Sequence, residues 1–129
     1  MNKSINVVAA IIIHNHRVLS CKRSYGEQKG GWEYPGGKIE KDESPEEALT
    51  REIKEELSTD ITVESHFMNI EYDYEKFHLH MECYICSANE SPITLNEHED
   101  FKWLSKDELS SVNWLEADRL ILDELSRVL

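Results

Sequence analysis

The stretch from Ile5 to Ile13, which reads INVVAAIII, places the strongest constraint on the fold. Its apolar residues are nearly continuous and rich in β-branched side chains, and the run is too short for most helices. A run of this kind predicts a central β-strand that is buried on both of its faces. The chain then needs layers on both sides of a sheet, which favours an α/β architecture.

Turn residues and alternating patterns divide the rest of the chain into further elements. His14-Asn15-His16 predicts a turn, and the glycine-rich stretch from Ser24 to Gly31 predicts a loop. Apolar and polar residues alternate between Phe77 and Cys86 with the period of a half-buried strand. Strands are expected over residues 17–23, 61–74, 77–86 and 101–104, with an acidic loop over 89–100 and a C-terminal helix marked by Ile121, Leu122, Leu125, Val128 and Leu129.

The segment from Ser44 to Leu57 predicts a helix whose start is visible in the sequence. Ser44 is a suitable N-cap, Pro45 suits the first helical position, and Glu47 completes a capping box with Ser44. Apolar residues then follow at intervals of four and form a narrow stripe that is expected to pack on the sheet: Leu49, Ile53 and Leu57.

Size and charge limit the functions that the chain can have. A chain of 129 residues is expected to form one domain, residues 1–129. Its 14 Lys and Arg against 26 Asp and Glu give a formal net charge of −12, which argues against a nucleic-acid polymer bound through a basic surface. No apolar run approaches the ~18 residues of a membrane-spanning helix, and no signal peptide is recognisable. We expect a soluble, cytoplasmic protein that does not bind membranes, as a monomer or a homodimer.

The chain has three cysteines, Cys21, Cys83 and Cys86. They do not suggest a disulfide framework, because their number is odd and a reducing compartment is expected. Cys83 and Cys86 are three residues apart in a predicted strand, so their side chains should point to opposite faces. We therefore interpret them as structural thiols and not as part of a zinc site.

Three glutamates of the predicted helix, Glu52, Glu55 and Glu56, fall within an arc of about 100°. Most glutamate-rich helix faces are simply solvated, and that alternative stands for this one. Two features favour a function: the helix dipole disfavours negative charge in the C-terminal half, and residues 35–37, Pro-Gly-Gly, let a backbone carbonyl approach the same point. Oxygen ligands gathered in this way suit Mg²⁺ or Mn²⁺, which bridge to substrate phosphates.

The residues from Gly37 to Thr59 resemble the Nudix box, G-x5-E-x7-R-E-U-x-E-E-x-G-U, in which U is aliphatic. Two positions depart from it, because Ser58 replaces the final glycine and Thr59 the final aliphatic residue. Glycine there serves a left-handed turn, so the departures concern the exit of the helix more than the metal ligands. The matching positions are Gly37, Glu43, Arg51, Glu52, Ile53, Glu55 and Glu56.

The resemblance covers most of the chain and is closest to the MutT and CTP pyrophosphohydrolase branch of the Nudix hydrolases. It implies the Nudix fold, an α/β/α sandwich with a mixed β-sheet. It also implies the Mg²⁺-dependent cleavage of a nucleoside triphosphate to the monophosphate and pyrophosphate.

By the same resemblance, the metal would be held by Glu52, Glu55, Glu56 and the carbonyl of Gly36. Arg51 would orient Glu52 through a charge-assisted hydrogen bond, and Glu52 would orient or deprotonate the attacking water.

Three further residues of the motif and the acidic loop receive roles from the resemblance. Glu97 would supply a further carboxylate to a metal or to the nucleophile, with Glu99 as the competing candidate. Glu43 is expected to brace the loop that precedes the helix.

The nucleoside would be recognised by residues outside the box. Arg23 and Lys38 are the nearest cations for phosphate or base contacts, with a solvated role as the alternative. Tyr34 is expected to stack on a base, whereas Trp32 and Phe77 are equally suited to the core. Asp118 stands where a MutT-like enzyme has a base-reading amide, and a carboxylate there would accept from an exocyclic amine such as cytosine N4.

The substrate is the most open point. His78 and His80 share a strand face and either meet solvent or line the pocket. The resemblance favours CTP, dCTP or modified dCTP, followed by 8-oxo-dGTP. The remaining alternatives are ADP-ribose or another substituted nucleoside diphosphate, and a non-catalytic module that senses a nucleotide.

Overall fold

The computed structural model describes residues 3–88 and 93–129. The strands are β1 (Lys3–His14), β2 (Arg17–Arg23), β3 (Trp32–Glu33), β4 (Gly36–Lys38), β5 (Ile61–Asp73), β6 (Phe77–Ala88) and β7 (His98–Ser105). The helices are α1 (Pro45–Leu57), the 3₁₀ helix η1 (Lys106–Ser111), α2 (Glu116–Arg119) and α3 (Leu122–Ser126).

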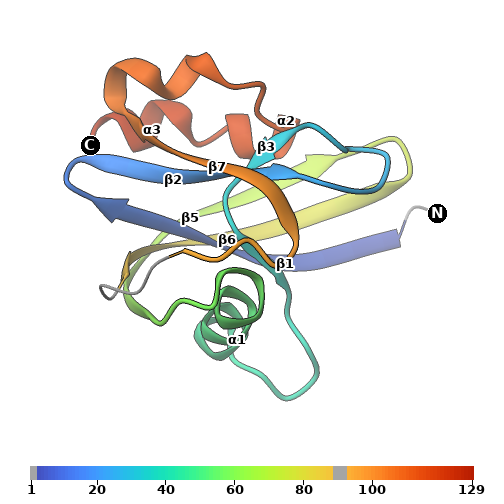
Figure 1. Ribbon diagram of the computed structural model, residues 1–129. Helices are drawn as coiled ribbons and strands as arrows, with labels where there is room; N and C mark the ends of the chain where they lie inside the picture. The colour runs from blue at the N-terminus through green and yellow to red at the C-terminus, as the bar shows by residue number, and fades with distance from the viewer. Residues whose placement is uncertain (1–2, 89–92) are drawn as a thin grey trace.

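The apolar run at the start of the chain forms β1, which lies at the centre of a mixed sheet with the order β3-β2-β1-β6-β5 (Figure 1). β1 runs parallel to β6 and antiparallel to β2 and β4. Its hairpin with β2 turns at Asn15 and His16, which both have positive φ. β7 pairs with the other edge of β2. The predicted central strand and turn are confirmed.

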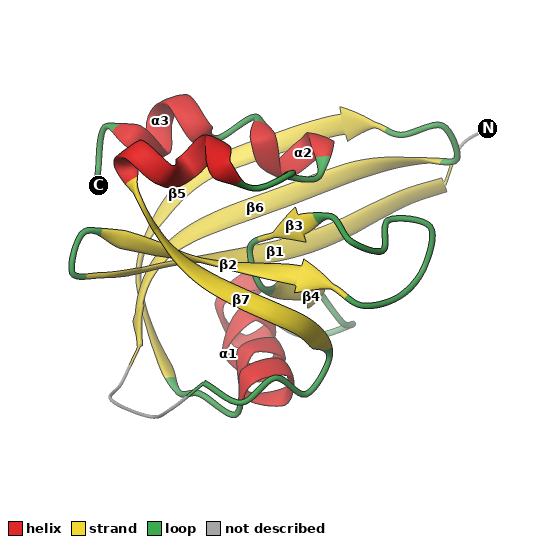
Figure 2. Cartoon of the chain, turned by 45° about the horizontal axis from the view of Figure 1, so that its top comes forward, coloured by secondary structure: helices red, strands yellow, loops and turns green. Residues whose placement is uncertain are grey.

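Helices cover both sides of the strands (Figure 2). Val8, Ala10 and Ile12 of β1 belong to a buried cluster with α1, whereas Ala9 and Ile11 belong to a second cluster that contains η1, α2 and α3 residues. Burial of both faces of β1 therefore produces the α/β/α layering that the Nudix resemblance implies.

α1 begins and packs as its sequence predicts. Ser44 is the N-cap, and the capping box with Glu47 is formed in both directions. The apolar stripe of the helix is fully buried against the sheet: Leu49, Ile53 and Leu57. The helix ends in a left-handed residue, Ser58 with φ 53°, so serine adopts the conformation for which the Nudix box has glycine. Thr59 is buried, and its hydroxyl donates to the Leu57 carbonyl.

Three expectations about the second half of the chain are corrected. β7 starts at His98, inside the stretch predicted as an acidic loop, because it pairs with β2 along its length. The predicted C-terminal helix is shorter than expected, because α3 ends at Ser126, before Val128 and Leu129, and a separate short helix, α2, precedes it. β6 is also buried on part of its polar face, because Tyr84 packs with α1. Residues 89–92 of the predicted loop lie outside the described residues.

The cysteines are free and buried, and Cys83 and Cys86 belong to the clusters on opposite faces of the sheet, as predicted. Among residues 3–88 and 93–129, no helix combines the length and the apolar character needed to cross a membrane.

Candidate active site

A cavity of about 480 Å³ is lined by residues of the strands β1, β4 and β6 and of the helices α1 and α2. This volume lies within the ~300–1,000 Å³ of typical small-molecule sites. Two groups of polar residues share its wall. We name the first the acidic cluster, which consists of the side chains of Glu52, Glu56 and Glu97 together with the backbone of Gly36. We name the second the Asp118 cluster: Arg23, Glu33 and Asp118.

Arg51 organises the start of the acidic cluster. Its Nε and Nη2 donate to the two oxygens of Glu43 at 2.7 and 2.9 Å, and its Nη1 donates to Glu52 Oε1 at 2.8 Å. Nη2 also donates to the Lys38 carbonyl. A planar guanidinium thus fixes Glu52 and ties α1 to the preceding loop. The contacts match the bracing and orienting roles expected for Glu43 and Arg51.

Glu56 is a buried carboxylate without a protein partner for one oxygen. Its side chain is 7% exposed, and Oε2 has no hydrogen-bond partner within the described part of the chain. Burial, together with the neighbouring carboxylates of Glu52 and Glu97, raises the pKa of Glu56 to about 9. Such an arrangement is costly for the protein alone and favourable for a bound cation.

The acidic cluster fits a divalent cation whose remaining coordination positions would be taken by substrate and water. Within residues 3–88 and 93–129, no group of three or more His, Cys, Asp or Glu side chains is arranged to hold a metal ion by itself. Mg²⁺ does not require one, because it commonly takes one or two carboxylates, several waters and substrate phosphates. The free oxygen of Glu56, beside Glu52, supplies the donor chemistry for that mode.

Glu55 is set apart from the other candidate ligands. Its side chain is 56% exposed, lies 3.4 Å from Arg51 Nη1, and is not part of the cavity wall.

Two glycines let the backbone approach the acidic cluster. A Cβ atom on Gly36 would lie 2.0 Å from the Val8 carbonyl oxygen, because β4 runs tightly against β1. A Cβ atom on Gly37 would lie 2.4 Å from Glu52 Oε2. The Pro-Gly-Gly sequence therefore brings the Gly36 backbone and the Glu52 carboxylate to the same wall of the cavity.

The two competing carboxylates of the acidic loop have different surroundings. Glu97 lines the cavity, and its backbone carbonyl accepts from the Ser24 hydroxyl at 2.6 Å. Glu99 lies outside the cavity wall and pairs with Lys22 at 3.7 Å. This placement favours Glu97 over Glu99 for a role in the site.

The two expected phosphate-binding cations also differ. Arg23 is held by Glu33, which accepts from Nη2 at 2.7 Å and from Nε at 3.2 Å. Its guanidinium is therefore already engaged within the cavity wall. Lys38 is exposed at the cavity, and its ammonium has no ion pair in the described part of the chain. Lys38 is thus the cation better suited to meet a phosphate.

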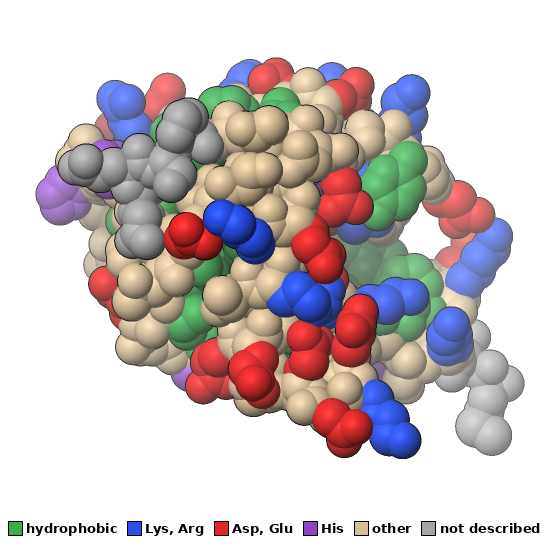
Figure 3. Space-filling view, turned by 60° about the horizontal axis from the view of Figure 1, so that its bottom comes forward, with side chains coloured by type: hydrophobic (Ala, Val, Ile, Leu, Met, Phe, Trp, Pro, Cys, Tyr) green, Lys and Arg blue, Asp and Glu red, His purple; other side chains and the backbone are tan. Residues whose placement is uncertain are grey.

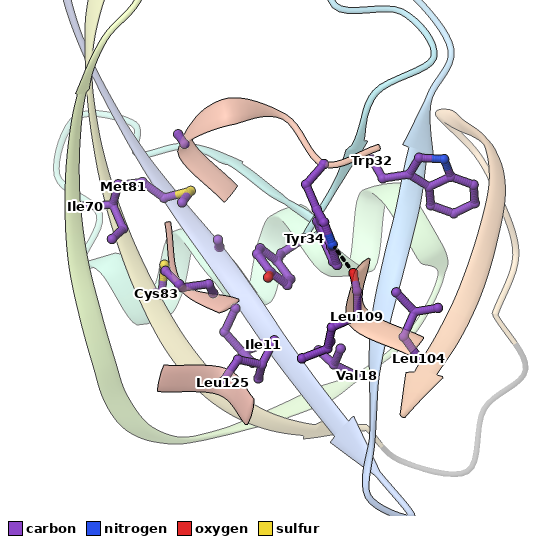
Figure 4. Close-up of a cluster of buried hydrophobic side chains, with 14 residues drawn as sticks. Ile11, Val18, Trp32, Tyr34, Ile70, Met81, Cys83, Leu104, Leu109 and Leu125 are labelled. Carbon is purple, nitrogen blue, oxygen red and sulfur yellow. Dashed lines mark hydrogen bonds between the residues drawn. The ribbon is translucent and has the colours of Figure 1, made fainter. Parts of the chain in front are cut away.

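The expected stacking of Tyr34 on a base is wrong. The residue is 3% exposed, and its ring stacks on Trp114 with centroids 4.6 Å apart. Figure 4 shows Tyr34 among the buried side chains of the core. Its backbone N–H, however, donates to Asp118 Oδ2 at 3.0 Å, so the residue supports the site through its main chain.

Asp118 lies in α2 with only 5% of its surface exposed. Burial and the nearby Glu33 raise the pKa of Asp118 to about 8. Near neutral pH its carboxyl group is therefore available as a neutral acid, which both donates and accepts a hydrogen bond. This is the donor and acceptor pattern of an amide side chain.

Comparison with known proteins identifies the family. The model of the NUDIX domain matches residues 3–125. The chain belongs to the NUDIX domain family. It is 32% identical over 122 residues to a CTP pyrophosphohydrolase of Escherichia coli (strain K12), covering 94% of this chain and 90% of the relative. It is 29% identical over 128 residues to an 8-oxo-dGTP diphosphatase of the same organism, covering 98% and 99%.

Solved structures agree with this assignment. The solution NMR structure of the Nudix hydrolase MutT from methicillin-resistant Staphylococcus aureus 252 superposes with a TM-score of 0.78, at 36% identity, and the match covers 99% of both chains. The chain with the acidic cluster and Asp118 is therefore a MutT-like Nudix hydrolase that acts on phosphoric anhydride bonds. Nudix hydrolases generally use divalent metal ions.

The acidic character of this Nudix protein is visible on its surface. Figure 3, which brings the α1 side of the molecule forward, shows Asp and Glu side chains gathered around several Lys and Arg side chains. His78 and His80 lie outside the cavity wall and contact Glu71, so the solvent-facing alternative fits them. Phe77 lines the cavity, and Trp32 is buried in the core.

Glu33 and His98 are two residues of the site that sequence reasoning did not single out. His98 Nε2 lies 3.0 Å from Glu33 Oε2, and His98 Nδ1 lies 3.7 Å from Glu56 Oε1. Hydrogen bonds from His98 and Arg23 outweigh the effect of burial and lower the pKa of Glu33. A histidine among acidic residues at 97–99 is the only local signal for His98 in the sequence. Its hydrogen-bond partner Glu33 is 65 residues away in the chain.

Proposed function

We propose that the protein is a Mg²⁺-dependent nucleoside triphosphate pyrophosphohydrolase that cleaves CTP, dCTP or a modified dCTP to the monophosphate and pyrophosphate. The observation that carries the proposal is the position of Asp118, a buried acid in the wall of the cavity that also contains the acidic cluster. One ligand can therefore contact a base-reading group and metal-binding carboxylates together.

The acidic cluster would serve the triphosphate. Glu56 and Glu52, with the Gly36 carbonyl, would hold Mg²⁺, and Mn²⁺ is a suitable substitute because it accepts the same oxygen ligands. The bound cation would neutralise phosphate charge and lower the pKa of a coordinated water.

The protein groups would then position the reactants. Glu52, held by Arg51 at 2.8 Å, would orient the attacking water or accept its proton, with Glu97 as a second carboxylate. Lys38 would contact the phosphate chain. In-line attack on phosphorus would release pyrophosphate, which leaves the nucleoside monophosphate in the cavity.

Asp118 would serve the base. One carboxyl oxygen accepts from the Tyr34 backbone N–H, which fixes the orientation of the group. A neutral acid at this position could accept from cytosine N4 and donate to the adjacent ring nitrogen N3, whereas an ionised carboxylate could only accept. The similarity to a CTP pyrophosphohydrolase across 94% of the chain supports the same substrate class.

The proposal is tested by measuring pyrophosphate release with Mg²⁺ from CTP, dCTP, 5-methyl-dCTP, dGTP, 8-oxo-dGTP and ADP-ribose. The expected result is preferential cleavage of the cytosine nucleotides, which Glu56→Gln abolishes and Glu99→Gln retains. Glu99→Gln is a matched control, because that carboxylate lies outside the cavity wall. Preferential cleavage of ADP-ribose would contradict the proposal, as would metal-dependent nucleotide binding without any cleavage.

A second candidate, 8-oxo-dGTP hydrolysis, follows from the same residue. A neutral acid at Asp118 presents both a donor and an acceptor, so it could also meet a guanine edge. The similarity to an 8-oxo-dGTP diphosphatase over 98% of the chain supports this alternative. A higher kcat/KM for 8-oxo-dGTP than for dCTP would favour it.

A further inference from the structure

His98 is a buried polar residue between two carboxylates that belong to different parts of the cavity. Its side chain is 5% exposed, and those of Glu33 and Glu56 are 14% and 7% exposed. His98 Nε2 lies 3.0 Å from Glu33 Oε2, which is a hydrogen-bond distance. His98 Nδ1 faces Glu56 Oε1 at 3.7 Å and has no hydrogen-bond partner in the described part of the chain.

The sheet places the imidazole in this position. Glu33 is in β3 and His98 is the first residue of β7, and the two strands flank β2 on opposite sides. A register shift between Lys22 and Arg23 interrupts the pairing of β2 with β7, directly beside His98. The Ser24 hydroxyl holds the preceding carbonyl, that of Glu97, at 2.6 Å. His98 is thus anchored on a strand and reaches across β2.

Each carboxylate is already connected to a functional group. Glu33 binds the Arg23 guanidinium with both of its oxygens, and its charge acts on Asp118. Glu56 is adjacent to Glu52, which Arg51 holds. His98 therefore lies between the Asp118 cluster and the acidic cluster, hydrogen-bonded to Glu33 of the first and facing Glu56 of the second. The hydrogen bond to Glu33 fixes the orientation of the imidazole, because a buried polar group that loses its partner is costly.

We propose that His98 is a positioning residue. Its hydrogen bond to Glu33 directs the imidazole at Glu56 and so holds Glu56 in its metal-binding position, which couples the Asp118 cluster to the acidic cluster. With Nε2–H donated to Glu33, the ring plane is fixed and Nδ1 is directed at Glu56. Loss of the Glu33 bond frees the ring to rotate, and Glu56 loses a wall of its pocket. This proposal rests on the role of Glu56 as a metal ligand given under the proposed function.

The test is a double-mutant cycle read by Mn²⁺ binding in the absence of nucleotide, measured by electron paramagnetic resonance of the free ion. The variants are Glu33→Gln, His98→Leu, their double variant and Glu56→Gln. Glu99→Gln is the control, because it removes an equal charge from the next residue in the chain, whose side chain pairs with Lys22 outside the cavity wall. Thermal unfolding of each variant verifies that it is folded.

Each single substitution is expected to weaken Mn²⁺ binding by about tenfold, the lower end of the effect of residues that orient metal ligands. The double variant should be no weaker than His98→Leu alone, because the effect of Glu33 passes through His98. Glu99→Gln should bind Mn²⁺ as the wild type does.

Two results would overturn the proposal. One is an equal effect of Glu33→Gln with histidine and with leucine at position 98, which would mean that Glu33 acts through space. The other is unchanged Mn²⁺ binding in folded His98→Leu. If no variant, Glu56→Gln included, differs from the wild type in Mn²⁺ affinity, the metal assignment fails together with the proposal. Normal coupling without cleavage of cytosine nucleotides would overturn only the proposed substrate.

Discussion

The carboxylate of Glu52 occupies the space next to Gly37 in which any larger residue would place its first side-chain carbon. A Cβ atom on Gly37 would lie 2.4 Å from Glu52 Oε2 and 2.5 Å from its carboxyl carbon. The atom in conflict belongs to a side chain and not to the backbone. A substitution at position 37 should therefore move the carboxylate and leave the fold intact.

Gly37→Ala is expected to lower kcat by about 100-fold, since displacement of a positioning group by about 1 Å has an effect of this size. Its melting temperature should stay close to that of the wild type. Gly36→Ala is the contrasting variant, because its Cβ atom would lie 2.0 Å from the Val8 backbone oxygen. That variant should lose roughly 1–3 kcal/mol of stability through overpacking. Equal losses of stability in both variants would contradict this reading.

Arg51→Lys tests the orientation of Glu52. A lysine ammonium cannot make the paired contacts to Glu43 and the contact to Glu52 at the same time. We expect kcat to fall by about 10–100-fold. Stability should change by no more than about 1 kcal/mol, because the ion pairs are partly exposed. The measurements are steady-state kinetics and urea unfolding, and full activity in the lysine variant would exclude the orienting role.

Glu56→Gln is expected to abolish cleavage while the folded protein becomes as stable as the wild type or more stable. Burial and the neighbouring carboxylates of Glu52 and Glu97 raise the pKa of Glu56 to about 9, so near neutral pH the folded protein must hold a proton on this group that the unfolded chain has lost. A permanently neutral amide removes that cost. Calorimetry without divalent ions provides the measurement. A clear drop in melting temperature would show that Glu56 has a structural role.

Asp118→Asn tests the raised pKa of a buried acid. Its pKa is about 8 in the folded protein and 3.8 in the absence of burial, so between these values the folded state holds a proton that the unfolded state has lost. The contribution of Asp118 is therefore most favourable at or below about pH 4 and is lost as the pH rises to 8. Asparagine removes this dependence.

Urea unfolding at pH 5 and pH 8 measures the effect. The difference in unfolding free energy between the two values should be smaller in Asp118→Asn than in the wild type. The variant should also retain base preference, because an amide has the same donor and acceptor pattern as a neutral acid. An identical pH dependence in the two proteins would refute the assignment.

Tyr34→Phe separates a core role from a base-binding role. The hydroxyl is buried and has no hydrogen-bond partner among the residues that the structure describes, and the ring stacks on Trp114. Removing an unsatisfied hydroxyl should leave stability unchanged or raise it by up to about 1 kcal/mol. Michaelis constants for CTP and dGTP should not change. A specific increase in one of the two Michaelis constants would indicate that Tyr34 contacts the nucleoside.

The parts of the fold that the sequence predicted are those with local signals. β1 followed from a continuous apolar run, and α1 followed from a capping box and residues spaced four apart. The C-terminal helix was only partly right, because α3 covers Leu122–Ser126 and ends before the apolar residues Val128 and Leu129, and no proline or glycine in the sequence marks that end.

The site was predictable where neighbours in the chain act together, and unpredictable where they do not. Arg51 and Glu52 are adjacent in the sequence, and their contact followed from the resemblance to a known motif. Tyr34 was misassigned because the residue that buries it, Trp114, is far away in the chain. His98 was not singled out for the same reason, since its partners lie on β3 and α1.

The burial of all three thiols makes this chain suited to site-specific labelling. Burial raises the pKa of each cysteine, to about 12 for Cys86, so the thiolate that reacts with maleimides is scarce. Tyr25, by contrast, is 62% exposed on the glycine-rich loop beside the cavity. A cysteine introduced at that position would carry a fluorophore or spin label without prior removal of the native thiols. Its signal would report directly whether the loop moves when a nucleotide enters.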